Sequence, residues 1–372
     1  MKLRLAVLAA IALVLVAPAL ASAPSVGGRA YYVQNATTGE VLLTRAPRER
    51  LPMASITKLM TVLVTLEHAR LGDVVTVTEQ AAQTGESTID LVPGEQLTIR
   101  DLVEAALIQS ANDAAVALAA YVGGTQQAFV ALMNRKAREL GLLDTHFANP
   151  DGLDAPDHYS SARDLTRLAE IAMHDPEIRD VVRQTAAVIA GGRLLRTWND
   201  LLSTFPHLIG VKTGHTSAAG WSEVAAARGR GVTIYATLLG EPTRAERNAD
   251  LTALLAWGLS RYRVVPVISS ERLYASVRAP YGRRALDLVA RREALRVVRI
   301  DRPLREQVVT PAVVSLPVER GRPLGEVRVY AGAKLIAREP LVAARSISRP
   351  GVFGRAAFYA KRTAHHFWAF LS

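Results

Sequence analysis

The segment Leu51-Pro-Met-Ala-Ser-Ile-Thr-Lys-Leu-Met-Thr61 contains the pattern on which the organisation of the whole chain depends. Apolar residues recur at nearly helical spacing from its second half onward, so we expect a helix that begins near Pro52 and Ser55. Residues three apart share one face of a helix. The Lys58 amine is therefore expected beside the Ser55 hydroxyl.

A serine and a lysine placed in this way can form a nucleophile and its base. A serine hydroxyl is a poor nucleophile until a nearby base takes its proton, and a lysine acts as that base only when burial or another cation lowers its pKa. The start of a helix adds a positive dipole end, which favours developing negative charge. Alone, this pattern is weak evidence, because Ser-x-x-Lys occurs about once by chance in a chain of this length. A capped surface helix is the alternative explanation of the same residues.

The composition indicates a folded protein of two or three domains, since 49% of the 372 residues are hydrophobic and 21% are charged. The formal net charge of +11 suggests an anionic neighbour such as nucleic acid, a lipid surface or an anionic polymer. The absence of cysteine excludes thiol catalysis, cysteine metal sites and a disulfide framework. The eight histidines show no His-Glu-x-x-His spacing, so a zinc peptidase is not expected. We expect no metal and no other cofactor.

Residues 1–23 have the features of a secretory signal peptide. Lys2 and Arg4 precede an apolar run, Leu5 to Val16, that is too short to span a bilayer comfortably. The small-x-small sequence Ala21-Ser-Ala23 follows and suggests cleavage after Ala23. Export argues against nucleic acid as the partner of this basic chain, and we expect none. A retained membrane anchor is the alternative.

The mature chain is expected to divide into three parts. Residues 24–262 mix a hairpin signal, at Ala30–Asn35 and Val41–Leu43, with helical and further strand signals, which indicates an α+β domain. Residues 263–345 carry short β-branched runs broken by proline and glycine, which is typical of a small all-β domain. No catalytic set is visible there, so we interpret it as a spacer or interaction module.

Residues 346–372 form the third part, a C-terminal helix with two unlike faces. Between Pro350 and Leu371 the aromatic and aliphatic residues fall on one side of a helical wheel and the lysine, arginines and histidines on the other, with no carboxylate. This pattern favours an interfacial helix that lies on an anionic bilayer through residues 350–371. The alternative is a helix docked on its own protein.

Two further motifs follow the first at wide separations. Ser110-Ala-Asn112 lies between two apolar helical segments, where polar residues occupy a buried or cleft-facing turn, although N-capping of the second helix also explains it. Lys212-Thr213-Gly214 lies in a strand-like segment, and an edge strand with a solvated lysine is the simpler account. The functional interpretation requires this strand to border the cleft of Ser55.

Together the three motifs are much more specific than any one of them, and the set resembles that of the penicillin-recognising serine acyltransferases. The sequence around them is similar to low-molecular-mass penicillin-binding proteins, which are exported D-alanyl-D-alanine carboxypeptidases. The resemblance covers roughly Tyr31 to Gly258. It implies a penicillin-binding-protein and β-lactamase-like domain with an antiparallel sheet flanked by helices, and more loosely a β domain and tail like those of membrane-perched members.

The resemblance implies catalytic roles for three residues and a binding role for a fourth. Ser55 corresponds to the acylated nucleophile and Lys58 to the base for acylation. Ser110 corresponds to a proton relay, and Asn112 to the residue that holds the substrate amide. The backbone N–H groups of Ser55 and His215 would form the oxyanion hole.

It also implies a site for the terminal carboxylate of the substrate. Lys212 would lie beside this carboxylate and Thr213 would hydrogen-bond to it, with Gly214 and Thr216 on the same substrate-binding strand. Arg247 matches an arginine near the carboxylate. More weakly, Ser87 belongs to a loop that borders the cleft.

The substrates implied are peptidoglycan stem peptides, with β-lactams as covalent inhibitors, outside the cytoplasm on the outer face of its membrane. A class A β-lactamase needs a glutamate with a nearby Leu-Asn, and neither 138–141 nor 149–152 matches. A D,D-endopeptidase or a transpeptidase uses the same residues. An inactive wall-binding protein is the non-enzymatic alternative.

Overall fold

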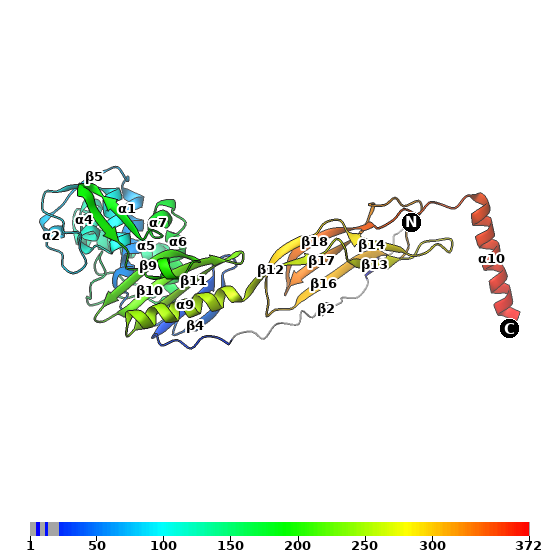
Figure 1. Cartoon of the computed structure of the whole chain (residues 1–372), viewed down its shortest axis with the longest axis horizontal. Helices are drawn as coiled ribbons and strands as arrows, with labels where there is room; N and C mark the ends of the chain where they lie inside the picture. The colour runs from blue at the N-terminus through cyan, green and yellow to red at the C-terminus, as the bar shows by residue number, and fades with distance from the viewer. Residues whose placement is uncertain (1–4, 8–11, 14–21, 372) are drawn as a thin grey trace. The chain divides into compact units, whose positions relative to one another are not determined.

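The computed structural model describes residues 5–7, 12–13 and 22–371 (Figure 1). The chain divides into two compact units, of which one is Ala21–Ser260. The other combines Arg261–Ser372 with two short strands near the N-terminus. The boundary at Ser260 lies two residues before the predicted boundary at 262.

A five-stranded antiparallel sheet forms the centre of the first unit, in the order β4-β3-β11-β10-β9. The predicted hairpin is its β3–β4 pair, and the Lys-Thr-Gly motif lies on the edge strand β9. The strands are β3 (Ala30–Asn35), β4 (Glu40–Arg45), β9 (Leu208–Thr216), β10 (Gly220–Gly229) and β11 (Val232–Glu241).

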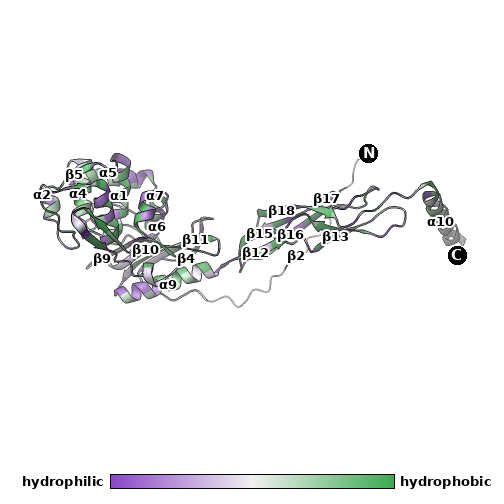
Figure 2. Cartoon of the chain, turned by 45° about the horizontal axis from the view of Figure 1, so that its top comes forward, coloured by the Kyte–Doolittle hydropathy of each residue, from purple (hydrophilic) through white to green (hydrophobic). Residues whose placement is uncertain are grey.

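Helices cover both faces of this sheet. Gly258 of α9 lies against Ile234 of β11, whereas the Thr166 hydroxyl of α6 bonds the Thr237 hydroxyl of β11 at 2.6 Å. Residues 234 and 237 point to opposite faces because side chains alternate along a strand. Figure 2 shows α9 hydrophilic at its start and hydrophobic further along. The helices of two turns or more are α1 (Lys58–His68), α4 (Asn112–Gly123), α5 (Gln126–Glu139), α6 (Ala162–Ala172) and α9 (Arg244–Ser260).

Shorter elements complete the unit. They are the 3₁₀ turns η1 (Ala54–Thr57) and η3 (Ala190–Gly192), the π-helical turn η2 (Ala105–Gln109), the helices α2 (Glu79–Ala82), α3 (Ile99–Glu104), α7 (Pro176–Val181) and α8 (Leu201–Thr204), and the strand pairs β5 (Val74–Thr76) with β6 (Gln96–Thr98) and β7 (Ala186–Ile189) with β8 (Arg193–Arg196). A capping box formed by Thr98 and Asp101 opens α3.

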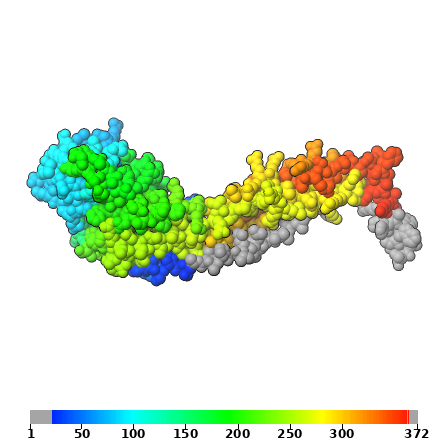
Figure 3. Space-filling view, viewed as in Figure 1, coloured from blue at the N-terminus to red at the C-terminus, as the bar shows by residue number. Residues whose placement is uncertain are grey.

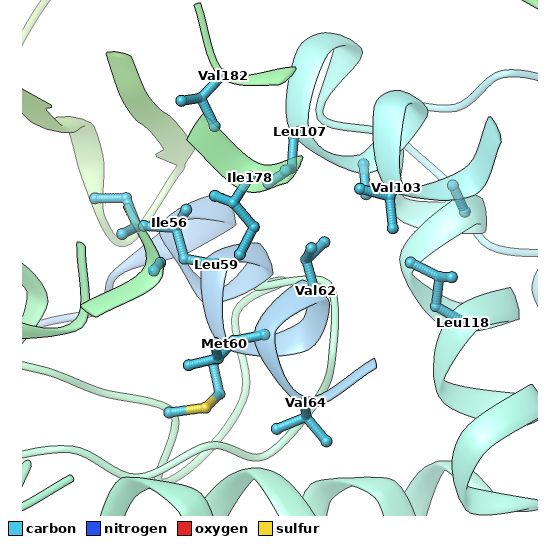
Figure 4. Close-up of a cluster of buried hydrophobic side chains, with 14 of the residues drawn as sticks. Ile56, Leu59, Met60, Val62, Val64, Val103, Leu107, Leu118, Ile178 and Val182 are labelled. Carbon is cyan, nitrogen blue, oxygen red and sulfur yellow. The ribbon is translucent and has the colours of Figure 1, made fainter. Parts of the chain in front are cut away.

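Helix α1 is the centre of the hydrophobic core. Eight consecutive residues, Lys58 to Thr65, are buried, so the helix is enclosed on all sides and not only along one face. Figure 4 shows Leu59, Met60 and Val62 of α1 pointing in different directions, among side chains from the helices that surround it. Lys58 is therefore held by a packed interior.

The structure differs from the prediction in the backbone that precedes each motif. Ser55 lies in the 3₁₀ turn η1, and α1 begins only at Lys58. The apolar helical segment before Ser110 is not one regular helix but α3 followed by the π turn η2, and Ser110 then adopts a left-handed conformation with φ of 65°. The helix propensities of the residues could not predict either feature, because both depend on tertiary contacts.

The second unit is the predicted all-β domain with a C-terminal helix. Its larger sheet runs β1-β16-β17-β18-β14-β13, with β2 also on β16, and β12 pairs with β15. The elements are β1 (Leu5–Val7), β2 (Ala12–Leu13), β12 (Tyr262–Ile268), β13 (Leu273–Val277), β14 (Leu286–Ala290), β15 (Ala294–Arg299), β16 (Leu304–Pro311), β17 (Pro323–Ala331), β18 (Lys334–Ala343) and α10 (Val352–Leu371).

Two predictions reach beyond the described residues. Strands β1 and β2 fall within the predicted signal peptide, most of which lies outside the described part. In α10 the side chains of Arg362 and of residues 364–371 also lie outside it, so the two-faced character of the tail stays a prediction. Among the described residues no single helix is long and apolar enough to cross a membrane, and only α4 with α5, bent by 87°, passes that test as a pair.

Replacing a core residue of α1 is expected to destabilise the first unit. Leu59 is fully buried, so Leu59→Ala should lower the free energy of unfolding by about 2–5 kcal/mol through lost burial and a cavity. Leu143 is 71% exposed, and Leu143→Ala should change it by less than about 0.5 kcal/mol. Urea unfolding followed by tryptophan fluorescence measures both, and equal effects would contradict the central placement of α1.

Candidate active site

Three segments distant in sequence meet at one cleft of about 210 Å³. They are the η1–α1 junction, the turn between η2 and α4, and the edge strand β9. The structure thus brings the three motifs together, as the functional interpretation required. The cleft is lined by Ser55, Glu86, Ser87, Ser110, Asn112, Gly152, Leu153, Trp198, Thr213, Gly214, His215, Thr216, Trp221 and Arg247.

The Lys58 amine contacts three oxygen atoms. Its Nζ lies 2.8 Å from Ser55 Oγ, 2.6 Å from Asn112 Oδ1 and 2.6 Å from the Asp151 carbonyl oxygen. The amide and carbonyl oxygens can only accept hydrogen bonds, whereas the hydroxyl can donate or accept. A neutral amine has two N–H groups and one lone pair, so Asn112 and Asp151 would take both donors. The lone pair would then face Ser55, ready to accept the hydroxyl proton.

Burial favours the neutral form of the Lys58 amine over the charged form. Lys58 is fully buried, and this desolvation lowers its pKa from the ordinary 10.5 to about 8, against the opposing effects of Asp151, Asp113 and Glu86. Of the two causes that can lower the pKa of a lysine, burial and a second cation, burial is the dominant one for Lys58.

Lys212 lies on β9, where it is buried and not solvated. Its Nζ donates to Ser110 Oγ at 2.9 Å and to the Thr213 carbonyl at 3.0 Å. Burial first, and the Lys58 charge second, lower the pKa of Lys212 well below its ordinary value. An anion bound beside Lys212 would favour its charged form and raise that pKa again.

Tight backbone contacts fix the turn that carries Ser55. Ala54 has a φ of 49°, in the left-handed region that non-glycine residues rarely adopt. A Cβ on Gly152 would lie 2.1 Å from the Ala54 carbonyl oxygen, and one on Gly214 would lie 3.2 Å from the Ser55 nitrogen. Only residues without a side chain let the 149–154 loop and β9 approach this closely. Gly214 was identified from its motif, whereas Gly152 as a packing requirement was missed.

Arg247 is buried at the far side of the cleft and held by acidic and polar groups. Its Nε lies 3.2 Å from Glu223 Oε2, its Nη2 donates to Asn248 Oδ1 at 2.6 Å, and Nη2 lies 3.7 Å from Asp200 Oδ2. Burial raises the pKa of the Glu223 carboxyl to about 7, against the charges of Arg247 and Lys212. Sequence reasoning missed Glu223, although a carboxylate before the apolar run Val224–Ala227 of a strand was a visible signal.

Aromatic residues form another part of the lining, which sequence reasoning also missed. The His215 ring stacks on Trp221 with centroids 4.1 Å apart, and the Arg244 guanidinium lies 5.3 Å from the Trp198 ring. Trp198 is 46% exposed and donates its Nε1–H to the Gln109 carbonyl, just before Ser110. The signal was two tryptophans on either side of the Lys-Thr-Gly motif.

Ser87 lies at the cleft as the resemblance implied. Its hydroxyl donates to the Gln109 carbonyl at 3.0 Å, and its own carbonyl accepts the Asn112 N–H at 2.7 Å. The Asn112 side chain donates in addition to the Gly85 carbonyl. Ser87 therefore braces the turn, and its hydroxyl is already engaged with the backbone.

His158 supports the nucleophile turn from behind. The Ala148 N–H donates to Nδ1 at 2.9 Å, so the ring proton resides on Nε2 and is donated to Thr57 Oγ1 at 2.8 Å. Burial lowers the pKa of His158 to about 4, which keeps this tautomer neutral at neutral pH. Within the described residues no group of three or more His, Asp or Glu side chains is arranged to hold a metal ion.

Comparison with known proteins agrees with this geometry. The family described as Peptidase S11, D-alanyl-D-alanine carboxypeptidase, matches residues 17–243. D-alanyl-D-alanine carboxypeptidase DacC of Escherichia coli (strain K12) is 32% identical over 349 residues, which cover 90% of this chain and 87% of the relative. DacF of Bacillus subtilis (strain 168) is 30% identical over 327 residues, or 84% of each chain.

Solved structures show the same relation. Penicillin binding protein 5 from Haemophilus influenzae has a TM-score of 0.65 at 25% identity and covers 88% of this chain and 100% of its own. The Streptomyces K15 DD-transpeptidase has a TM-score of 0.61 at 32% identity over 64% of this chain and 100% of its own. With its Ser-x-x-Lys, Ser-x-Asn and Lys-Thr-Gly motifs around one cleft, the chain belongs to the D-alanyl-D-alanine carboxypeptidase family of serine peptidases.

Proposed function

We propose that this D-alanyl-D-alanine carboxypeptidase uses Ser55 as its acylated nucleophile and releases the terminal D-alanine of peptidoglycan stem pentapeptides. The observation that supports this most directly is the bonding of Lys58. Its amine lies 2.8 Å from Ser55 Oγ, and its two other contacts are oxygens that can only accept hydrogen bonds. The neutral amine is thereby oriented as a base toward the hydroxyl.

Acylation follows from this arrangement. Lys58 takes the proton of Ser55 as Oγ attacks the carbonyl of the penultimate D-alanine. The backbone N–H groups of Ser55 and His215 stabilise the oxyanion, a role supported by the close approach of β9 to the Ser55 nitrogen. Protonated Lys58 returns its proton through the Ser110 hydroxyl to the amine of the departing D-alanine as the C–N bond breaks. Water then attacks the ester, which frees Ser55 and the shortened peptide.

The substrate is held by its charged end and by its backbone. Thr213 and the buried cations Lys212 and Arg247 surround the place of the terminal carboxylate, where low dielectric strengthens their attraction for an anion. Asn112 binds the peptide amide from the opposite wall. β-Lactams carry a comparable carboxylate beside a strained amide, so they acylate Ser55 and leave slowly.

The rival hydrolase reaction has less support. Glu139, the glutamate weighed for a β-lactamase, lies on the surface of α5, 52% exposed and paired with Lys136. It does not line the cleft, so it cannot activate a deacylating water there. The endopeptidase and transpeptidase alternatives use the same cleft and are separated by their products.

The location follows from the two ends of the chain. Family members act on the cell wall, which requires export, and residues 1–23 supply the signal. We place the enzyme on the outer face of the cytoplasmic membrane, anchored peripherally by residues 350–371. Exposure of Val352 and Phe353 at the start of α10, 70% and 92%, supports a contact with lipid.

Acylation should map to Ser55. Mass spectrometry of the full chain with benzylpenicillin should show one adduct on Ser55, and a stem pentapeptide should yield free D-alanine. Ser55→Ala should lose the adduct and at least about a thousand-fold in D-alanine release, whereas Ser203→Ala, at an exposed serine of α8, should keep both. An adduct elsewhere, or D-alanine release by Ser55→Ala, would refute the assignment.

Acylation should accelerate with rising pH. The neutral form of Lys58 is the active one, so the second-order rate of benzylpenicillin acylation should rise through a midpoint near pH 8. Lys58→Arg keeps a permanent positive charge and should lose about a hundred-fold or more, while Lys136→Arg, outside the cleft, should retain the wild-type profile. A flat profile between about pH 6 and pH 10 would contradict the role of Lys58 as base.

Removing residues 350–372 should weaken binding to anionic vesicles at least about tenfold through lost apolar burial, with D-alanine release unchanged. Vesicle sedimentation measures the binding. The informative control is Phe353→Ala in the full chain. Its binding to vesicles should lie between that of the unaltered chain and that of the shortened chain. Unchanged sedimentation of the shortened chain would rule out the tail as anchor.

A further inference from the structure

The β domain carries most of the excess positive charge of this protein. Residues 261–349 contain 19 lysines and arginines and eight carboxylates, a formal charge of +11 that equals the value for the whole chain. Residues 22–260 contain 21 cations and 26 carboxylates and are therefore net negative. Eighteen of the 19 β-domain cations are arginines, whose planar fork suits phosphate and carboxylate groups.

Seven exposed arginines of this domain lie in three neighbouring segments at one end of the sheet, and we call them the arginine cluster. The segments are the β13–β14 turn, the connection before β17 and the stretch after β18. Hydrogen bonds join them: Arg345 Nη2 donates to the Arg284 and Ala285 carbonyls at 3.0 Å, and the Arg320 N–H donates to Ser346 Oγ at 2.9 Å. The members are Arg278, Arg283, Arg284, Arg320, Arg322, Arg345 and Arg349.

The cluster is not neutralised by the protein. Within the described residues none of its seven side chains forms an ion pair, and Glu319 is the one carboxylate in the three segments. Several arginines elsewhere in the domain are paired, for example Arg272 with Glu306 at 2.9 Å and Arg338 with Glu326 at 2.5 Å. Like charges gathered without counter-charges repel one another. Such an arrangement calls for an external anion.

The start of α10 meets the same end of the sheet. The ring of Tyr281, in the β13–β14 turn, lies 5.9 Å from Phe358 and 6.2 Å from Tyr359 in edge-to-face geometry. Figure 3 shows the red surface that follows β18 beside the yellow surface of this region, as the bond from Arg345 to Arg284 requires. Exposed apolar residues of α10 and unpaired arginines of the β domain are therefore adjacent.

We propose that the arginine cluster is a second membrane-binding surface, on which the β domain itself contacts the phosphate groups of an anionic bilayer. This inference rests on the proposed anchoring by residues 350–371. Guanidinium groups near a negatively charged leaflet gain attraction that falls off within a Debye length, so α10 must first bring them to the surface. The cluster then holds this end of the β domain against the headgroups, which a single interfacial helix alone does not do.

Strand β14 provides a matched pair of variants. Arg283-Arg284 precede it in the cluster, and Arg291-Arg292 follow its other end, exposed and outside the cluster. Each doublet changed to glutamate alters the net charge of the full chain equally. Sedimentation with vesicles of phosphatidylglycerol and phosphatidylcholine, over a range of salt, compares R283E/R284E with R291E/R292E. Far-UV circular dichroism confirms that the β domain of both variants folds, and D-alanine release confirms the same for the catalytic unit.

R283E/R284E should bind anionic vesicles at least about tenfold more weakly and with a shallower salt dependence, while R291E/R292E changes binding less than about twofold. Equal losses in both doublets would overturn the proposal, because net charge alone would explain them. Unchanged binding of R283E/R284E would overturn it while leaving the anchoring by residues 350–371 in place. The proposal would also be overturned if R283E/R284E kept vesicle binding but lost binding to a purified phosphodiester wall polymer. The arginine cluster would then bind that polymer and not the membrane.

Discussion

The burial of one amine, that of Lys58, is the constraint on which the rest of the active site depends. An amine removed from water loses the hydration that stabilises its charge, and here this lowers its pKa to about 8. Two acceptor-only oxygens, from Asn112 and Asp151, then decide which way its lone pair points. Of the three oxygens that contact the amine, that of the Ser55 hydroxyl is the one that can donate a hydrogen bond. The lone pair of Lys58 therefore faces this hydroxyl and activates it as a nucleophile.

This constraint explains why the backbone around the site is unusual. The oxygens of Ser55, Asn112 and the Asp151 carbonyl come from three separate segments and must all reach the buried nitrogen of Lys58. Ordinary helix geometry does not bring these segments close enough. Four unusual backbone features allow the close approach: the π turn η2, the left-handed Ser110, the positive φ of Ala54 and Gly152, which has no side chain. Such features are costly and persist only where the surrounding packing fixes them. The fully enclosed helix α1 supplies that packing, without any disulfide.

The sequence was sufficient for the parts of this fold that depend on pattern. The hairpin β3–β4, the all-β domain and the C-terminal helix all follow from periodicity, turn residues and motif context. It was insufficient where a tertiary contact decides. No local signal distinguishes Ser110 from a helix cap, or reveals that Glu223 lies against Arg247. The net charge of +11 was visible, but the excess of cations in residues 261–349 gains meaning only when the folded loops gather the arginines.

The claim that burial sets the proton affinity of Lys58 can be measured directly. The chain has only six lysines, so ¹³C-labelling at Cε gives a spectrum in which Lys58 is assigned by its absence from Lys58→Arg. In the full-length protein without ligand, the Lys58 resonance should titrate near pH 8, while that of Lys136 titrates above the ordinary value for lysine. Titration of Lys58 at about 10.4, as in an exposed lysine, would contradict the account.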